Sequence, residues 1–149
     1  VVAYIAEQIL PFCNKNCIRE KVHEGDVQML GTSGTVTTLG AVHLKLPYYI
    51  RSRVDGLKIG FDELANTTRV ITDLRYEERV ALPCIGQERA ELVIPGCAIL
   101  EAICRSWPVG HLRIADRGLR EGMLIELMLA DGIPILGNPA IIGEFSGSR

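Results

Sequence analysis

Apolar side chains recur along this chain at two spacings, one typical of helices and one typical of short strands. Residues 1–13 carry an apolar stripe at helical spacing, and residues 34–45 do so directly after a glycine-rich turn. Similar stripes predict further helices over residues 61–75, 76–81, 86–106 and 118–130, with a kink or break at Pro95-Gly96.

Short apolar runs over residues 26–30 and 111–116 predict two strands, and residues 54–59 fit a short extended segment. The resulting order is helix, strand, helix, helical insert, strand, helix. This order favours an α/β fold with at least partly parallel pairing and helices packed on the sheet. Two strands are too few for an independent sheet, so we expect further strands from a longer chain or from a partner.

The first strand leads into the turn Gly31-Thr32-Ser33-Gly34-Thr35. In open α/β sheets, ligands bind beyond the carboxyl ends of the strands, and helix N-termini there attract phosphate. The two glycines can adopt positive φ and can let a ligand approach the backbone. The three hydroxyl groups can donate to phosphate or ribose oxygens, and one of them can cap the following helix.

The second strand leads into Asp116, Arg117 and Gly118. A carboxylate here suits a ribose hydroxyl, a metal-bound water or a helix cap, and the arginine can offer paired donors to phosphate. Ordinary turn and cap chemistry explains the same residues, because neither turn is a P-loop or a GxGxxG motif. The residues alone therefore indicate an α/β domain with two candidate phosphate-facing turns.

The composition and the net charge limit the classes of partner that the chain is expected to bind. The chain of 149 residues has 48% hydrophobic and 23% charged residues, which suits one folded domain. Its net charge of −2 gives no basic excess for nucleic acid or for an anionic membrane surface. No apolar stretch is long enough to span a bilayer, and the first residues do not read as a signal peptide. Arg51, Arg53 and Lys58 form the one local basic cluster, which is either a polyanion-binding patch or a solvated loop.

The five cysteines are an odd number, which favours reduced thiols in a cytoplasm. Cys97 and Cys104 share a helical stripe and are expected in the core. Cys13, Cys17 and His23 lack a fourth ligand at a suitable spacing, so we expect no metal site. Trp107 is expected in the core or at an interface.

Four stretches together resemble the exopolyphosphatase/guanosine pentaphosphate phosphatase (Ppx/GppA) family. They are LGTSGTVTTLGAVHL, YYIRSRVDGLKI, LPCIGQERAELVIPGCAILEAI and LRIADRGLREGMLIELM, and they occur in the family's order between about residues 26 and 130. The turn Gly31–Thr35 resembles the family's adenosine-type loop, and ADRGLREG resembles its second connecting motif. Glu91 stands where the family more commonly has Asp.

The resemblance implies the fold of the actin, sugar kinase and Hsp70 superfamily, in which two RNase-H-like domains surround a cleft. The chain resembles most of the second domain over residues 1–149, without its opening strands and without the first domain. Family members hydrolyse the terminal bonds of inorganic polyphosphate or guanosine pentaphosphate with Mg²⁺. The implied phosphate- or nucleotide-facing residues are Gly31, Thr32, Ser33, Gly34, Thr35, Asp116 and Arg117.

The departures from the family pattern limit what this chain can do alone. The two phosphate loops, of the DxGSNS and DIGGGS kinds, are absent from it, and so is the first-domain catalytic glutamate. No catalytic residue can therefore be assigned, and we expect the chain alone to be inactive. The expected partners are polyphosphate or guanosine phosphates, a first domain, and a second copy across an open sheet edge. The alternatives are a non-catalytic module that binds a nucleotide or alarmone, and a purely structural fragment with no ligand.

Overall fold

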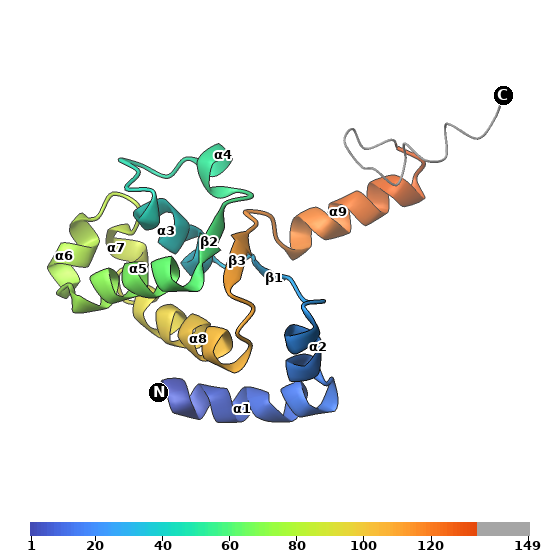
Figure 1. The fold of residues 1–149 in the computed structure, drawn as a ribbon. Helices are drawn as coiled ribbons and strands as arrows, with labels where there is room; N and C mark the ends of the chain where they lie inside the picture. The colour runs from blue at the N-terminus through green and yellow to red at the C-terminus, as the bar shows by residue number, and fades with distance from the viewer. Residues whose placement is uncertain (134–149) are drawn as a thin grey trace. The chain divides into compact units, whose positions relative to one another are not determined.

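The computed structural model describes residues 1–133, and the chain divides into two units, Val1–Asp116 and Arg117–Arg149. The first unit contains, in chain order, α1 (Val2–Lys15), α2 (Ile18–Glu24), β1 (Met29–Gly31), α3 (Gly34–His43), α4 (Arg51–Val54), β2 (Lys58–Gly60), α5 (Phe61–Asp73), α6 (Tyr76–Ala81), α7 (Gly86–Arg89), α8 (Val93–Ser106) and β3 (His111–Ile114) (Figure 1). The described part of the second unit contains α9 (Leu119–Ala130).

The sheet of the first unit has the order β1-β3-β2. Strands β1 and β3 are parallel, with Gly31 opposite Ile114, whereas β2 is antiparallel to β3. The predicted α/β class with partly parallel pairing is therefore confirmed. The third strand comes from the end of the segment predicted to be extended, so the two predicted strands are joined by one from the same chain.

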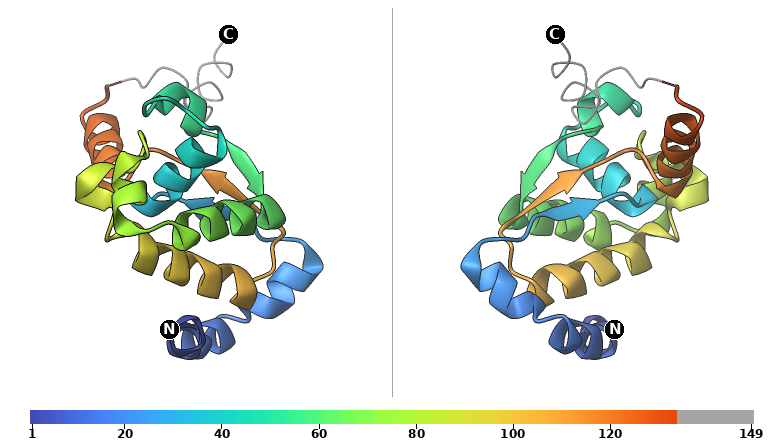
Figure 2. Two further views of the ribbon diagram at one scale, coloured as in Figure 1. Left: turned by 90° about the vertical axis from the view of Figure 1, so that its left-hand side faces the viewer. Right: turned by 90° about the vertical axis from the view of Figure 1, so that its right-hand side faces the viewer.

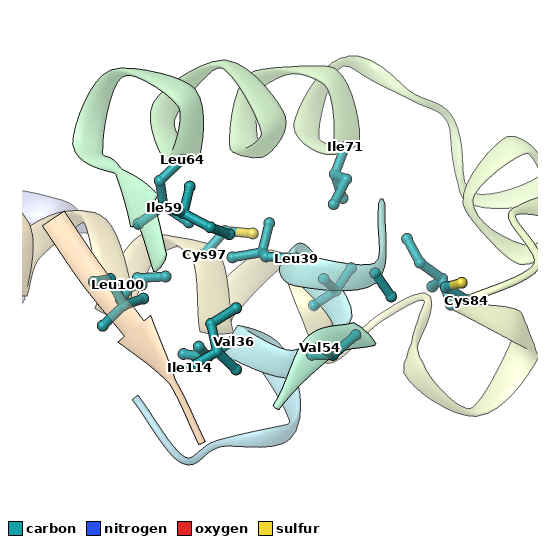
Figure 3. Packing of buried hydrophobic residues seen from close by; sticks show 14 of the residues in the cluster. Val36, Leu39, Val54, Ile59, Leu64, Ile71, Cys84, Cys97, Leu100 and Ile114 are labelled. Carbon is teal, nitrogen blue, oxygen red and sulfur yellow. The ribbon is translucent and has the colours of Figure 1, made fainter. Parts of the chain in front are cut away.

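One face of the sheet carries the core. Ile59, Leu112 and Ile114 are buried there, and they pack with buried side chains of α3, α5 and α8 (Figure 3). These three helices lie on the same side of the sheet (Figure 2). Leu39 of α3 and Ile71 of α5 are fully buried, and each such side chain contributes roughly 1.5–3 kcal/mol relative to exposure. Helix α3, which carries the candidate turn at its start, is thus fixed on the sheet by its packing.

The opposite face of the sheet carries one row of exposed side chains. Leu30, Arg113 and Lys58 occupy neighbouring register positions on β1, β3 and β2, and all three are exposed. Because side chains alternate between the faces of a strand, this row and the buried row belong to opposite faces.

Residues 86–106 are largely helical as predicted, but the predicted position of the break, at Pro95-Gly96, is wrong. The chain forms α7 and α8 with a break at residues 90–92, and Pro95 and Gly96 lie in the first turn of α8. Proline is tolerated in a first turn because its missing N–H has no partner there anyway. Two further helices, α2 and α4, were not predicted.

The prediction that Cys97 and Cys104 lie in the core is confirmed for Cys97 alone. Cys97 is buried in the core, whereas Cys104 is half-buried at its edge. All five thiols are free, and the described residues contain no group of three His, Cys, Asp or Glu side chains that could hold a metal ion. Trp107 is half-buried and contacts Phe12 of α1, with ring centroids 6.4 Å apart.

Within residues 1–133, no helix is both long and apolar enough to cross a bilayer.

Candidate functional site

Parallel pairing brings the ends of β1 and β3 to the same edge of the sheet. The N–H of Ala115 donates to the carbonyl oxygen of Gly31 at 2.9 Å, which continues the pairing past the last residue of β3. The turn Gly31–Thr35 and the carboxylate Asp116 therefore follow neighbouring strand ends. The structure thus brings together the two sets of residues that the sequence singled out within the first unit.

The two glycines of the turn have different surroundings. Neither uses the positive φ that is open to glycine. A Cβ at Gly31 would lie 2.8 Å from Val36 Cγ1 and 3.2 Å from Leu112 Cδ1, so core packing requires glycine there. A Cβ at Gly34 would meet nothing within 4 Å, so the backbone of α3 is open at this residue.

The three hydroxyl residues of the turn also differ. Ser33 Oγ caps α3 by accepting a hydrogen bond from the N–H of Val36 at 3.3 Å. Thr35 packs against Gly96 of α8, where an added Cβ would lie 2.1 Å from Thr35 Oγ1. Thr32 is exposed. Helix geometry gives the first-turn N–H groups of Gly34 and Thr35 no carbonyl partner inside α3.

Asp116 is the centre of a polar cluster at this edge. Its Oδ2 accepts a hydrogen bond from Arg51 Nε at 2.7 Å, and its backbone N–H donates to Asp55 Oδ1 at 3.0 Å. The Tyr49 side chain hydrogen-bonds to Asp116 and to Thr37. These hydrogen bonds therefore hold the segment that contains α4 against the chain just after β3.

The charges of this cluster shift two pKa values in opposite directions. Burial alone would raise the pKa of Asp116, but hydrogen bonds from Tyr49 and Arg51 and the positive charges of Arg51 and Arg89 outweigh it, so the pKa is lowered. Burial, together with the hydrogen bond to Asp116 and its negative charge, raises the pKa of Tyr49 to about 12. Asp116 is therefore held as a carboxylate, and Tyr49 is held as a neutral hydrogen-bond donor.

Arg89 is a member of this cluster that sequence reasoning did not single out. It is the last residue of α7, and its Nη1 donates to Thr38 Oγ1 of α3 at 2.9 Å. Its charge also contributes to the lowered pKa of Asp116. No local sequence pattern marks Arg89, Tyr49 or Asp55 as site residues, because each reaches the site through contacts between segments that are distant in the sequence.

The three basic candidates lie on different elements. Arg51 and Arg53 belong to α4, whereas Lys58 belongs to β2 and pairs with Arg113 of β3 in the sheet register. Arg51 makes an ion pair with Asp116, and its own side chain is 63% exposed. The proposed polyanion patch therefore contains one arginine that is already engaged by a carboxylate.

Arg117 belongs to the second unit and is exposed. Next to it, the N–H of Gly118 donates to Glu121 Oε2 at 2.7 Å, which caps the start of α9. Part of the second candidate turn therefore has an ordinary capping role.

Two grooves occur elsewhere on the first unit. One, of about 490 Å³, is lined by residues of α5 and α8, among them Arg69, Glu101 and Cys104. The other, of about 680 Å³, lies between the end of α3, α5 and residues 82–84, and both apolar residues such as Val70 and polar ones such as Glu63 line it. Residues of the candidate turn Gly31–Thr35 line neither of these two grooves.

Known proteins share this sequence pattern and fold. The model of the Ppx/GppA phosphatase family matches residues 5–131. The chain is similar to the structure of the Aquifex aeolicus PPX-GPPA enzyme, with a TM-score of 0.63 and 25% identity over 67% of this chain and 34% of that one. A second Aquifex aeolicus Ppx/GppA structure gives a TM-score of 0.66 with 22% identity, over 78% of this chain and 39% of that one.

An exopolyphosphatase from Cytophaga hutchinsonii shares the fold with a TM-score of 0.65 and 15% identity, over 89% of this chain and 42% of that one. The present chain spans less than half the length of each of these structures. The family model nevertheless covers most of its length. The chain belongs to the Ppx/GppA phosphatase family.

Proposed function

We propose that this chain supplies the phosphate- or nucleotide-facing wall of a phosphatase that hydrolyses terminal phosphoanhydride bonds of inorganic polyphosphate or guanosine pentaphosphate. One observation carries the proposal: the parallel pairing of β1 with β3 sets the open N-terminus of α3 beside a cluster of two arginines around Asp116. The proposed role is to hold the substrate and to neutralise its charge.

The groups at this edge suit an anionic, hydroxyl-bearing ligand. The first-turn N–H groups of Gly34 and Thr35 and the positive end of the helix dipole favour phosphate oxygens. Guanidinium groups such as that of Arg89 can bind phosphate through two donors. Phosphoryl transfer depends mainly on such positioning and charge neutralisation, which a wall of this kind provides.

In the proposed reaction, water attacks the terminal phosphorus and the bond to the bridging oxygen breaks. The Asp116 carboxylate is a weak base with a lowered pKa, and it is engaged by Arg51 and Tyr49. It therefore does not suit the role of general base. We infer that the base and the remaining phosphate loops belong to a first domain, as the family resemblance implies.

The donors on the described residues do not fit a protein-held Mg²⁺ site. Asp116, the central carboxylate at this edge, is paired with Arg51, so its Oδ2 is engaged and does not suit a metal ligand. Mg²⁺ usually keeps several waters and is carried by one or two carboxylates with substrate phosphates. We therefore derive no step through Mg²⁺ from this chain. The free thiols suit a reducing compartment such as the cytoplasm, which we propose as the location.

A non-catalytic nucleotide- or alarmone-binding module is the second candidate. The weakly basic Asp116, which Arg51 and Tyr49 engage, favours it for this chain, because the edge of the sheet offers donors for a ligand and its central carboxylate is a poor proton acceptor for hydrolysis. The two candidates share the same binding surface and differ in whether a first domain completes the chemistry.

Equilibrium binding of inorganic polyphosphate and of guanosine pentaphosphate to the 149-residue chain tests the shared surface. We expect Gly34→Val to weaken binding while the chain stays folded, because the added side chain enters open space over the α3 N-terminus. Arg89→Gln should weaken it as well. Arg105→Gln is the matched control, because Arg105 is also an exposed arginine, paired with Glu101 on α8.

Unchanged affinity in folded Gly34→Val and Arg89→Gln variants would contradict the proposal that this surface binds the substrate. Equal weakening by Arg105→Gln would show that binding follows total charge and not this surface. Polyphosphate binding without guanosine pentaphosphate binding, or the reverse, would distinguish the two proposed substrates.

A further inference from the structure

Asp116 is reachable from solvent although two side chains engage it. Its side chain is 20% exposed. Arg51 Nε donates to Oδ2, and the Tyr49 side chain makes a further hydrogen bond to the carboxylate. A carboxylate has about four acceptor positions on its two oxygens. Asp116 therefore keeps the capacity to accept a hydrogen bond from a ligand.

Short hydrogen bonds link this carboxylate to the start of α3. The Tyr49 side chain hydrogen-bonds both to Asp116 and to Thr37. Thr37 Oγ1 donates to the carbonyl oxygen of Gly34, the first residue of α3, at 3.1 Å. One small ligand can therefore meet the carboxylate, which is an acceptor, and the first turn of α3, which offers N–H donors.

The formal charges around Asp116 balance one another. Arg51 and Arg89 contribute two positive charges that act on Asp116. Asp116 itself and Asp55, which accepts the N–H of Asp116, contribute two negative charges. Two positive and two negative charges sum to zero, so these four residues offer a bare polyanion no net attraction. Such a ligand would also compete with Asp116 for Arg51.

We propose that Asp116 is a specificity-determining residue, which accepts a sugar hydroxyl of a nucleoside polyphosphate and disfavours a polyphosphate that carries no sugar. The inference rests on the proposed function and narrows its substrate class to guanosine phosphates. The phosphates of the ligand lie on the first-turn N–H groups of Gly34 and Thr35, and the ion pair between Arg51 and Asp116 stays in place.

The ionised form of Asp116 is what makes the discrimination effective. An ionised carboxylate accepts a hydroxyl group more strongly than a neutral oxygen does. The same negative charge repels a phosphate that approaches the carboxylate. The lowered pKa of Asp116 keeps both effects present at neutral pH.

Three probes with the same number of phosphoryl groups test the inference on the 149-residue chain. They are guanosine triphosphate, its analogue without the two ribose hydroxyls, and inorganic tripolyphosphate. Isothermal titration calorimetry at neutral pH without Mg²⁺ measures the dissociation constant of each. We expect the wild type to bind guanosine triphosphate about tenfold more tightly than the analogue without hydroxyls. Tripolyphosphate should also bind more weakly than guanosine triphosphate.

Three aspartate variants separate the two roles of the carboxylate. Asp116→Asn should lose most of the preference for the hydroxyl-bearing nucleotide and should bind tripolyphosphate several-fold more tightly. Asp55→Asn changes the charge of the cluster equally, but the oxygen of Asp55 accepts the N–H of Asp116 and is not the proposed ligand acceptor. It should strengthen tripolyphosphate binding and keep the hydroxyl preference. Asp26→Asn, at an exposed aspartate outside the cluster, should change neither.

Equal affinity of the wild type for the two nucleotides would overturn the inference, and this comparison needs no variant. A hydroxyl preference that survives in Asp116→Asn, shown to be folded by circular dichroism, would assign the hydroxyl contact to another residue. Unchanged tripolyphosphate affinity in that variant would contradict the role of its charge.

The two proposals fail in different ways. Equal binding of all three probes that Gly34→Val weakens would overturn this inference and leave the proposed binding surface standing. Absence of binding by every probe would overturn the proposed function and this inference with it.

Discussion

Arg51 and Asp116 are 65 positions apart in the sequence, yet Arg51 Nε donates to Asp116 Oδ2 at 2.7 Å. The contact joins α4 to the end of β3 and brings Tyr49 to the same carboxylate. A loop between α3 and β2 is thereby held against the edge of the sheet that carries the candidate site. The position of this loop is a tertiary feature that predicts measurable behaviour of both residues.

Asp116 should make folding more stable above its titration range than below it. Its folded-state pKa lies below the ordinary value of 3.8, so the charged form stabilises the fold. This contribution is present above about pH 4 and is lost as the pH falls through the lower folded-state value. Asp116→Asn should cost about 1–2 kcal/mol at pH 7, since solvent weakens the ion pair with the exposed Arg51.

Urea unfolding at pH 7 and at pH 3 measures this difference. Asp116→Asn should lose less stability than the wild type between the two pH values, and Asp26→Asn, at an exposed aspartate outside the cluster, should behave as the wild type does. Identical pH profiles of the wild type and Asp116→Asn would contradict the lowered pKa.

Tyr49 should lose its proton only at unusually high pH. Its pKa is raised to about 12, whereas a tyrosine in water titrates near pH 10. The chain contains four tyrosines. In a pH titration followed by the ultraviolet absorbance of tyrosinate, one late component should therefore appear at high pH, and Tyr49→Phe should remove it. Tyr48→Phe should retain this component. A late component that survives in Tyr49→Phe would assign it to another residue.

Gly96 should be sensitive even to alanine. A Cβ at this position would lie 2.1 Å from Thr35 Oγ1, so α8 and α3 would have to separate. We expect Gly96→Ala to lower the free energy of unfolding by about 1–3 kcal/mol, the usual cost of overpacking. Gly122→Ala, where a Cβ meets nothing within 4 Å, should be neutral or stabilising.

A double-mutant cycle with Thr35→Gly locates the cause. Removing the threonine side chain should recover part of the stability lost in Gly96→Ala, because the two positions are in contact. Strict additivity of the two changes would show that the loss arises elsewhere.

The 149-residue chain alone should release no phosphate from polyphosphate in the presence of Mg²⁺. Asp116, the central carboxylate of the cluster, does not suit the role of general base, and the phosphate loops that the family resemblance implies are absent from the sequence. Phosphate release, measured against a full-length family member as positive control, checks this expectation. A rate similar to that of the control would show that a first domain is not needed.

Local sequence determined most of the helices. Helix α6 begins at residue 76 and ends at residue 81 as predicted, because Glu78 accepts the N–H of Arg75 at its start and Pro83 prevents continuation. Helix α5 starts as predicted for a similar reason, with Glu63 accepting the N–H of Gly60. Caps, prolines and apolar spacing act within a few residues, so a sequence displays them directly.

Short elements and the break before α8 were decided by packing. Helix α4 has four residues, too few to show a period. It is held by hydrogen bonds that join its Arg51, and Asp55 just after it, to Asp116 beyond the end of β3. The sequence pattern predicts a kink or break at Pro95-Gly96. In the structure, the missing side chain of Gly96 lets α8 approach Thr35 of α3. A glycine that permits close helix contact and one that ends a helix are identical in sequence.

For the candidate site, the sequence determined the turn Gly31–Thr35 and Asp116, because each directly follows an apolar strand. Only the tertiary structure decided that these two segments are neighbours, and that Tyr49, Arg51 and Arg89 gather around the carboxylate. The physical reason is that strand pairing and ion pairs join residues many positions apart, and their partners are chosen by the packing of the whole sheet and not by the residues beside them in the chain.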